Sequence, residues 1–162
     1  MYPKTPVLGR LRPATIRDVP RIAVVATAGM YYSHNFAWER PHHASYPEDT
    51  LKSFEKKFAD FIRDPDYITL VIEDSYKADE SERTGAVIIA DAEDVQYNPG
   101  DPVIVGVATW KLEPGSVRRG QFLDSEDAEH SEAMIYDGGL GRDTNLSHCA
   151  LLYEKYGSTA EK

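Results

Sequence analysis

The chain has 162 residues, of which 41% are hydrophobic and 28% are charged, a composition typical of one soluble globular domain. Its formal net charge of −9 argues against a nucleic-acid partner, because binding to phosphates requires a basic surface. The single cysteine, Cys149, excludes an intrachain disulfide and indicates a reducing compartment, so we expect a cytoplasmic protein. Its longest apolar stretch, residues 22–30, is too short to span a membrane.

The first third of the chain predicts a short strand followed by two helices. Residues 11–14 read as extended, and Thr15 with Asp18 forms the capping box that starts a helix. Residues 31–46 form a loop or a broken helix that is rich in aromatic side chains. A second helix is predicted from Pro47 to the Asp64–Pro65 step, with Phe54, Phe58 and Phe61 among the residues that it buries against a sheet.

Three β-type runs follow, at residues 67–73, 86–91 and 103–112. Simple alternation along the third run places Val103, Val105 and Val107 on one face and Ile104 and Ala108 on the other. We therefore expect residues 1–112 to form one structural unit.

Beyond residue 112 the pattern weakens, and residues 113–162 are predicted to be a polar insertion or tail. Residues 143–156 predict a helix there, with Leu146, Ala150, Leu151 and Tyr153 near one face.

Three segments stand out in the sequence: the opening LRPAT at residues 11–15, the strand TLVIE at residues 69–73 and the strand VGVATW at residues 105–110. In these segments and in the order of its elements, the chain resembles the GNAT superfamily of acyl-CoA N-acyltransferases, in particular its filamentous-fungal type. The resemblance covers about two thirds of the chain. The resemblance implies an α/β fold whose sheet is mixed and mainly antiparallel, with two helices after the first strand. It also implies transfer of an acetyl group from acetyl-CoA to a small-molecule or peptide amine by direct attack, without a metal.

Members of this family bind the pyrophosphate of acetyl-CoA at a Gln/Arg-x-x-Gly-x-Gly/Ala loop that opens a helix, where free N–H groups and the helix dipole favour anions. Two glycine-containing segments of this chain can be compared with that loop, residues 117–121 and residues 137–142. The second is the better candidate and makes Gly139 and Gly141 the cofactor-binding residues, after a short strand predicted at residues 133–136. Tyr136 stands where the family has Gln or Arg, and a surface turn would equally explain the glycines.

We therefore expect the domain to be incomplete, with residues 143–162 matching a helical insertion that precedes the cofactor motif. The alternatives are a truncated gene product, a fragment and a degenerate paralogue. In each case the strand at residues 103–112 keeps an open edge, so we expect the chain either to self-associate through it or to be only marginally folded.

The resemblance makes Tyr31, Phe36 and Trp38 the candidate substrate-binding residues, because the loop between the two helices lines the acceptor pocket in this family. A catalytic base cannot be assigned, since a solvated turn explains Asp91, Glu93 and Asp94 equally well.

Two other patterns do not indicate a site. The neighbouring His42 and His43 lack the further ligands that a metal site requires, and His148 with Cys149 does not have the spacing of a catalytic dyad.

Three function classes follow. The first is an N-acetyltransferase, the second a non-catalytic fragment or interaction protein, and the third a small-molecule binding module that uses the aromatic loop. An intact cofactor loop would favour the enzyme.

Overall fold

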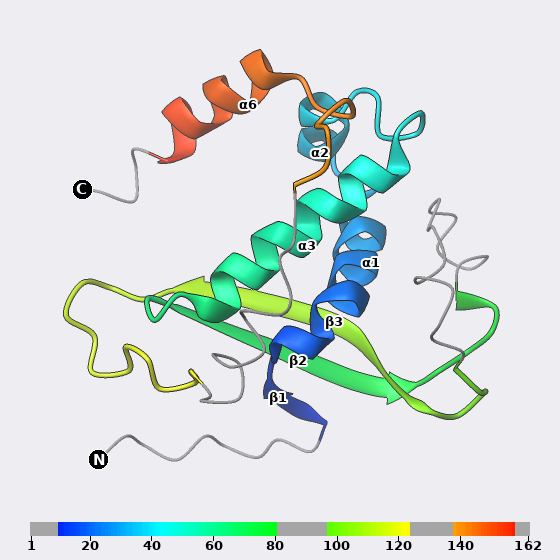
Figure 1. Cartoon of the computed structure of the whole chain (residues 1–162), viewed down its shortest axis with the longest axis vertical. Helices are drawn as coiled ribbons and strands as arrows, with labels where there is room; N and C mark the ends of the chain where they lie inside the picture. The colour runs from blue at the N-terminus through cyan, green and yellow to red at the C-terminus, as the bar shows by residue number, and fades with distance from the viewer. Residues whose placement is uncertain (1–9, 81–96, 124–137, 158–162) are drawn as a thin grey trace.

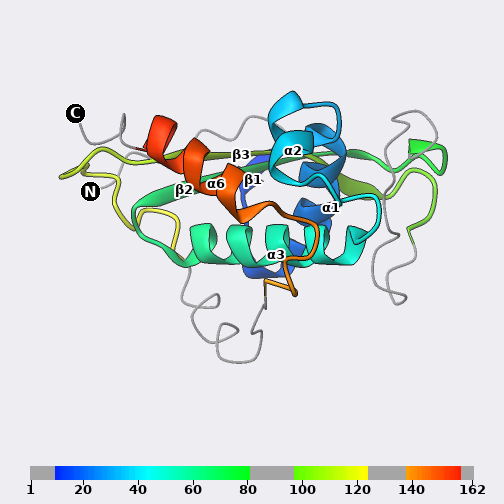
Figure 2. The same cartoon turned by 90° about the horizontal axis from the view of Figure 1, so that it is seen from above.

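A computed structural model describes residues 10–80, 97–123 and 138–157. Its strands form a three-stranded antiparallel sheet in the order β1 (Leu11–Pro13), β2 (Tyr67–Ser75) and β3 (Pro102–Lys111). Helices α1 (Val19–Met30) and α3 (Pro47–Arg63) lie on the same side of this sheet (Figures 1 and 2). The α/β class and the placement of helices after the first strand are confirmed, whereas the strand predicted at residues 86–91 lies outside the described residues.

The predicted capping box starts the helical segment as expected. A short 3-10 turn, η1 (Ile16–Asp18), precedes α1, and the Thr15 backbone N–H donates to Asp18 Oδ2 at 2.8 Å. The same carboxylate receives two hydrogen bonds from the Arg12 guanidinium, at 2.7 and 2.9 Å. Because Arg12 belongs to β1, this ion pair connects the first strand to the start of α1.

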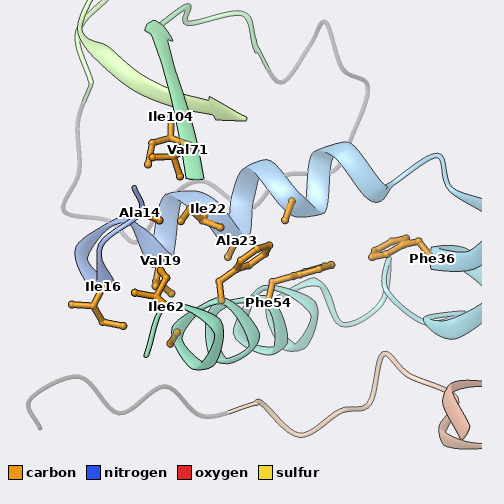
Figure 3. Close-up of a cluster of buried hydrophobic side chains, with 13 residues drawn as sticks. Ala14, Ile16, Val19, Ile22, Ala23, Phe36, Phe54, Ile62, Val71 and Ile104 are labelled. Carbon is orange, nitrogen blue, oxygen red and sulfur yellow. The ribbon is translucent and has the colours of Figure 1, made fainter. Parts of the chain in front are cut away.

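The core lies between α1, α3 and the sheet (Figure 3). Phe54 and Phe58 on α3 are each 8% exposed, and Phe61 is partly buried against the same cluster, which confirms the predicted helical face. Ile22 of α1 and Val71 of β2 are fully buried. The apolar residues of α3, which recur at helical spacing, therefore form one face of the helix, and this face is buried against the sheet.

The faces predicted for β3 are wrong, and a β-bulge is the reason. Gly106 pairs with Ile72 and Ile104 pairs with Glu73, so Val105 has no partner in β2. An extra residue reverses the alternation beyond it. As a result, Ile104 and Val107 both contact the core, while Val105 is 45% exposed.

The region between α1 and α3 contains a short helix, α2 (His34–Glu39). The predicted C-terminal helix is present in shorter form as α6 (Leu146–Leu152), followed by a π-helical turn, η2 (Tyr153–Gly157). Its apolar residues do not pack as a face: Leu146, Leu151 and Tyr153 are 79%, 54% and 81% exposed. α6 is held instead by its contact with α2, beside which it lies in Figure 1.

Candidate functional site

A small cavity of about 10 Å³ lies where the end of α1, the α2 region and the start of α3 meet. Three rings form its wall: the His43 ring packs edge to face against Tyr31 at 5.5 Å and against Phe36 at 5.0 Å between centroids. The space is sufficient for about one water-sized group. The other lining residues are Thr27, Ala44, Pro47, Thr50 and Leu51.

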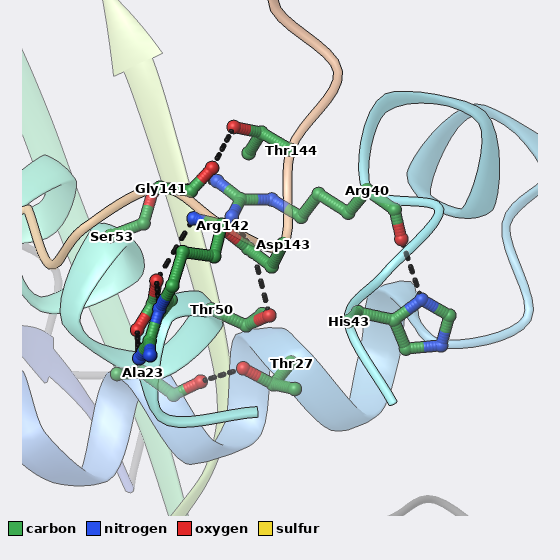
Figure 4. A network of polar contacts seen from close by, with 11 residues as sticks. Ala23, Thr27, Arg40, His43, Thr50, Ser53, Gly141, Arg142, Asp143 and Thr144 are labelled. Atoms are coloured by element: carbon green, nitrogen blue, oxygen red, sulfur yellow. Dashed lines mark hydrogen bonds and ion pairs between the residues drawn. The ribbon is translucent and has the colours of Figure 1, made fainter. Parts of the chain in front are cut away.

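A backbone carbonyl fixes the orientation of the His43 ring. Its Nδ1 lies 2.7 Å from the carbonyl oxygen of Arg40 (Figure 4). Because a carbonyl oxygen only accepts hydrogen bonds, Nδ1 carries the proton, and in the neutral ring Nε2 is therefore an acceptor.

The structure brings together two of the three residues predicted to bind the substrate. Tyr31 and Phe36 line the cavity, and Phe36 is 5% exposed. Trp38 lies elsewhere, stacked on His148 of α6 with centroids 4.1 Å apart and planes 3° apart. The sequence did not predict that His43 lies beside these two rings, because its only local signal was an adjacent histidine pair without further metal ligands.

The segment that contains Gly139 and Gly141 packs on the first turns of α3. Both glycines have positive φ angles, of 68° and 66°. A Cβ at Gly139 would lie only 3.2 Å from Asp49 Cα, so the close approach of the two backbones requires a glycine there.

Arg142 joins the same segment to α3. Its side chain donates to Asp49 through Nη2 at 2.7 Å and Nε at 3.0 Å, and its backbone N–H donates at 2.9 Å. These hydrogen bonds lower the pKa of Asp49 to about 2. The guanidinium also lies over the ring of Tyr46, 4.6 Å from its centroid.

Asp143 adds a second, buried connection. Its side chain is fully buried, pairs with the Arg40 guanidinium and accepts a hydrogen bond from the Thr50 hydroxyl at 2.7 Å. Arg40 also donates to Ser53 at 2.6 Å, so one network links α3, the α2 region and the start of the α6 segment (Figure 4).

The geometry around the glycines does not fit a pyrophosphate. Four residues, Arg142 to Asn145, separate Gly141 from the start of α6, so the glycines do not open a helix. The first N–H groups of α6 are taken by the side chain of Asn145, which accepts from Ser147 and His148. The strand predicted at residues 133–136 lies outside the described residues.

The alternative glycine segment, residues 117–121, is a packed turn as well. The Gly120 N–H donates to the carbonyl of Pro65 at 2.9 Å, and Arg119 pairs with Asp66 at 2.6 Å. Neither glycine segment therefore shows a phosphate cradle in the part of the chain that the structure describes.

A larger groove of about 780 Å³ runs between α1, α3 and β3. Apolar side chains form most of its wall, including Val24, Phe58 and the bulged Val105. Arg21, at one end, donates to the Ile104 carbonyl at 3.1 Å and pairs with Glu80 at 2.8 Å. The groove is compatible with the body of a ligand.

The remaining candidates show no catalytic arrangement. His148 Nδ1 lies 2.7 Å from the Trp38 carbonyl oxygen, and burial raises the pKa of the Cys149 thiol, which disfavours the reactive thiolate. Asp91, Glu93 and Asp94 lie outside the described residues.

Within the described ranges, no group of three or more His, Cys, Asp or Glu residues is placed to hold a metal ion, and no helix is long and apolar enough to cross a membrane.

Comparison with known proteins finds a fungal relative. The chain is 34% identical over 122 residues to a protein of Stachybotrys chartarum named "Acetyltransferase". The alignment covers 75% of this chain but 44% of that relative, in its N-terminal part. The match confirms the resemblance to a fungal acetyltransferase, and the chain spans less than half of the relative's length. No known protein-family profile matches the chain, and no solved structure matches it significantly.

Proposed function

We propose that the protein is an N-acetyltransferase of the GNAT type, which transfers an acetyl group from acetyl-CoA to an amine. The observation that carries the proposal is the similarity to the Stachybotrys acetyltransferase over three quarters of the chain. The order β1, α1, α2, α3, β2, β3 agrees with the N-terminal half of that fold.

In this proposal the described residues supply the acceptor side of the reaction. Tyr31 and Phe36 line a cavity beside the helices, whereas Gly139 lies close to Asp49 at the start of α3. Acetyl-CoA would supply the activated acetyl group.

A non-catalytic interaction protein is the second candidate, and the sheet provides the observation in its favour. Ile72 and Trp110 are 45% and 52% exposed, and a groove of about 370 Å³ is lined by Leu70, Trp110 and Phe122 among others. In the described part of the chain, β3 pairs only with β2, so a second copy could add a strand at its other edge. Light scattering during size-exclusion chromatography tests this self-association, which a monomer at all concentrations would refute.

The enzymatic proposal is tested by mixing the purified protein with acetyl-CoA and a panel of primary amines and short peptides, and by following release of the CoA thiol. Release that requires both the protein and an amine supports the proposal. Equal release with and without each amine contradicts it and favours the interaction protein.

A further inference from the structure

We propose that residues 142–152 form a strap that holds the cavity beside Tyr31 and Phe36 closed, and that this cavity opens when the strap lifts away from α2. The inference rests on the proposed function for its biological meaning, because the two rings would then belong to the acceptor side. The opening itself is a property of the fold and is tested without acetyl-CoA.

The cavity is too small for a substrate in the state that the structure shows. Its volume of about 10 Å³ accommodates one water-sized group, whereas ligand pockets measure about 300–1,000 Å³. Phe36 of α2 lines the cavity and is 5% exposed. Because α1 and α3 are core helices, entry of an organic ligand requires the α2 region to move.

Three contacts join the α6 end of the strap to α2. The backbone N–H of Asn145 donates to the carbonyl of Glu39 at 2.8 Å. His148 donates through Nδ1 to the carbonyl of Trp38 at 2.7 Å, and the two rings stack with their centroids 4.1 Å apart. Trp38 is 39% exposed, so this end of the strap is held at the surface, where contacts open readily.

The other end of the strap is held more firmly. Arg142 makes three hydrogen bonds to Asp49, and the buried Asp143 meets Arg40 and Thr50 (Figure 4). Asp49 and Thr50 both belong to α3. The strap can therefore lift at its α6 end while its first residues stay on α3.

Lifting the strap leaves most of the core intact. The members of the hydrophobic core cluster lie between Ala14 and Val107, before the strap begins, and α2 contributes one of them, Phe36. Leu146 and Leu151 of α6 are largely exposed. Segments that bury little apolar surface open at a lower free energy than core strands do. We therefore expect α2 and α6 to open together, before the sheet unfolds.

A closed resting state lowers the affinity for any ligand that enters only when the strap is lifted, in proportion to the open fraction. Trp38 and His148 thus control access to the cavity although neither lines it. The contact between them is autoinhibitory, and a substitution can loosen it without altering the wall of the cavity.

Amide hydrogen exchange detected by NMR measures this opening in the whole chain. The amide of Asn145 reports the strap, and the amide of Arg40, which donates to the Phe36 carbonyl, reports α2. Both should exchange through one opening with equal protection, and both should exchange faster than the paired amides of β2 and β3.

Three variants define the contact. His148→Ala removes the stack and a hydrogen bond, so exchange at Arg40 should be about tenfold faster while exchange in β2 and β3 stays unchanged. Trp38→Ala keeps its carbonyl and should accelerate exchange less. His34→Ala is the matched control, because His34 is exposed on the first turn of α2 and makes no contact with the strap within the described residues.

A thiol probe tests whether the same opening exposes the cavity. Thr27 lines the cavity and is 6% exposed, so Thr27→Cys in a Cys149→Ser background reports access to it. His148→Ala should speed the reaction of this thiol by about the factor seen in amide exchange. Val71→Cys in the same background reports the buried sheet and should not respond.

Two results would overturn the inference: protection of Asn145 and Arg40 equal to that of β2, or an unchanged reaction rate at the Thr27→Cys thiol in His148→Ala. If His148→Ala fails to fold, Trp38→Ala takes its place in both measurements. Shared local opening without any acetyl transfer would keep the strap and reject the proposed function. Acetyl transfer by a protein in which Asn145 and Arg40 exchange only with the sheet would reject the strap and leave the function standing.

Discussion

Arg142 meets Asp49 through two side-chain hydrogen bonds and one backbone hydrogen bond, although 93 residues separate them in the sequence. The contact places the segment before α6 on the first turns of α3. The next residue, Asp143, continues the connection into the interior. The two neighbours thus fix the segment that contains Gly139 and Gly141.

Asp143→Ala should be strongly destabilising. The substitution leaves the largely buried Arg40 without its carboxylate partner, and breaking a buried ion pair costs about 3–5 kcal/mol. Urea unfolding followed by circular dichroism measures the loss. Asp60→Ala is the matched control, because Asp60 forms an exposed pair with Lys56 and its loss should lie within experimental error. Equal effects of the two substitutions would show that the Asp143 pair is not buried.

Asp49 should make stability depend on acid pH. Its pKa falls from an ordinary 3.8 to about 2 in the folded state, so the unfolded chain binds the proton more tightly. The stabilisation is present above about pH 4 and is lost as the pH falls towards 2. Urea midpoints measured between pH 5 and pH 2 should therefore decline less steeply in Asp49→Asn than in the original protein. Parallel curves would contradict the role of the Arg142 contact.

Phe58→Ala should cost about 3–5 kcal/mol, because Phe58 is buried between α3 and the sheet. Phe61→Ala is the comparison on the same helix. Phe61 is only partly buried, so its loss should be smaller. Thermal or urea unfolding measures both variants, and a cost below about half a kcal/mol for Phe58→Ala would mean that α3 packs differently.

Acetyl-CoA should bind this 162-residue chain weakly, with a dissociation constant above the low micromolar range. The physical reason is that, among the residues that the structure describes, neither glycine segment presents open helix N–H groups to the pyrophosphate. Isothermal titration calorimetry provides the measurement. Low micromolar binding that is lost in folded Gly139→Ala and Gly141→Ala variants would contradict this prediction. It would show that these glycines form the cofactor site.

Local signals in the sequence were sufficient for much of the fold. The Thr15–Asp18 box and the Phe54–Phe58 spacing act within a single helix, so neighbouring residues determine the outcome. The bulge at Val105 depends on the register with β2, which no local pattern encodes.

The site was less predictable for the same reason. Tyr31 and Phe36 belong to one aromatic segment, and the family resemblance indicated both. The orientation of the His43 ring depends on the Arg40 carbonyl, and Thr50 reaches the same cavity from another helix. Trp38 lies apart from this cavity because its ring stacks on His148, which comes from a distant segment.

The most direct test of acetyl transfer follows an isotopically labelled acetyl group from acetyl-CoA to a primary amine by mass spectrometry. We expect labelled amide when the protein, acetyl-CoA and a primary amine are combined, and none when the protein is omitted. Absence of label on every primary amine, with a folded protein and acetyl-CoA supplied far above the micromolar range, would contradict this expectation.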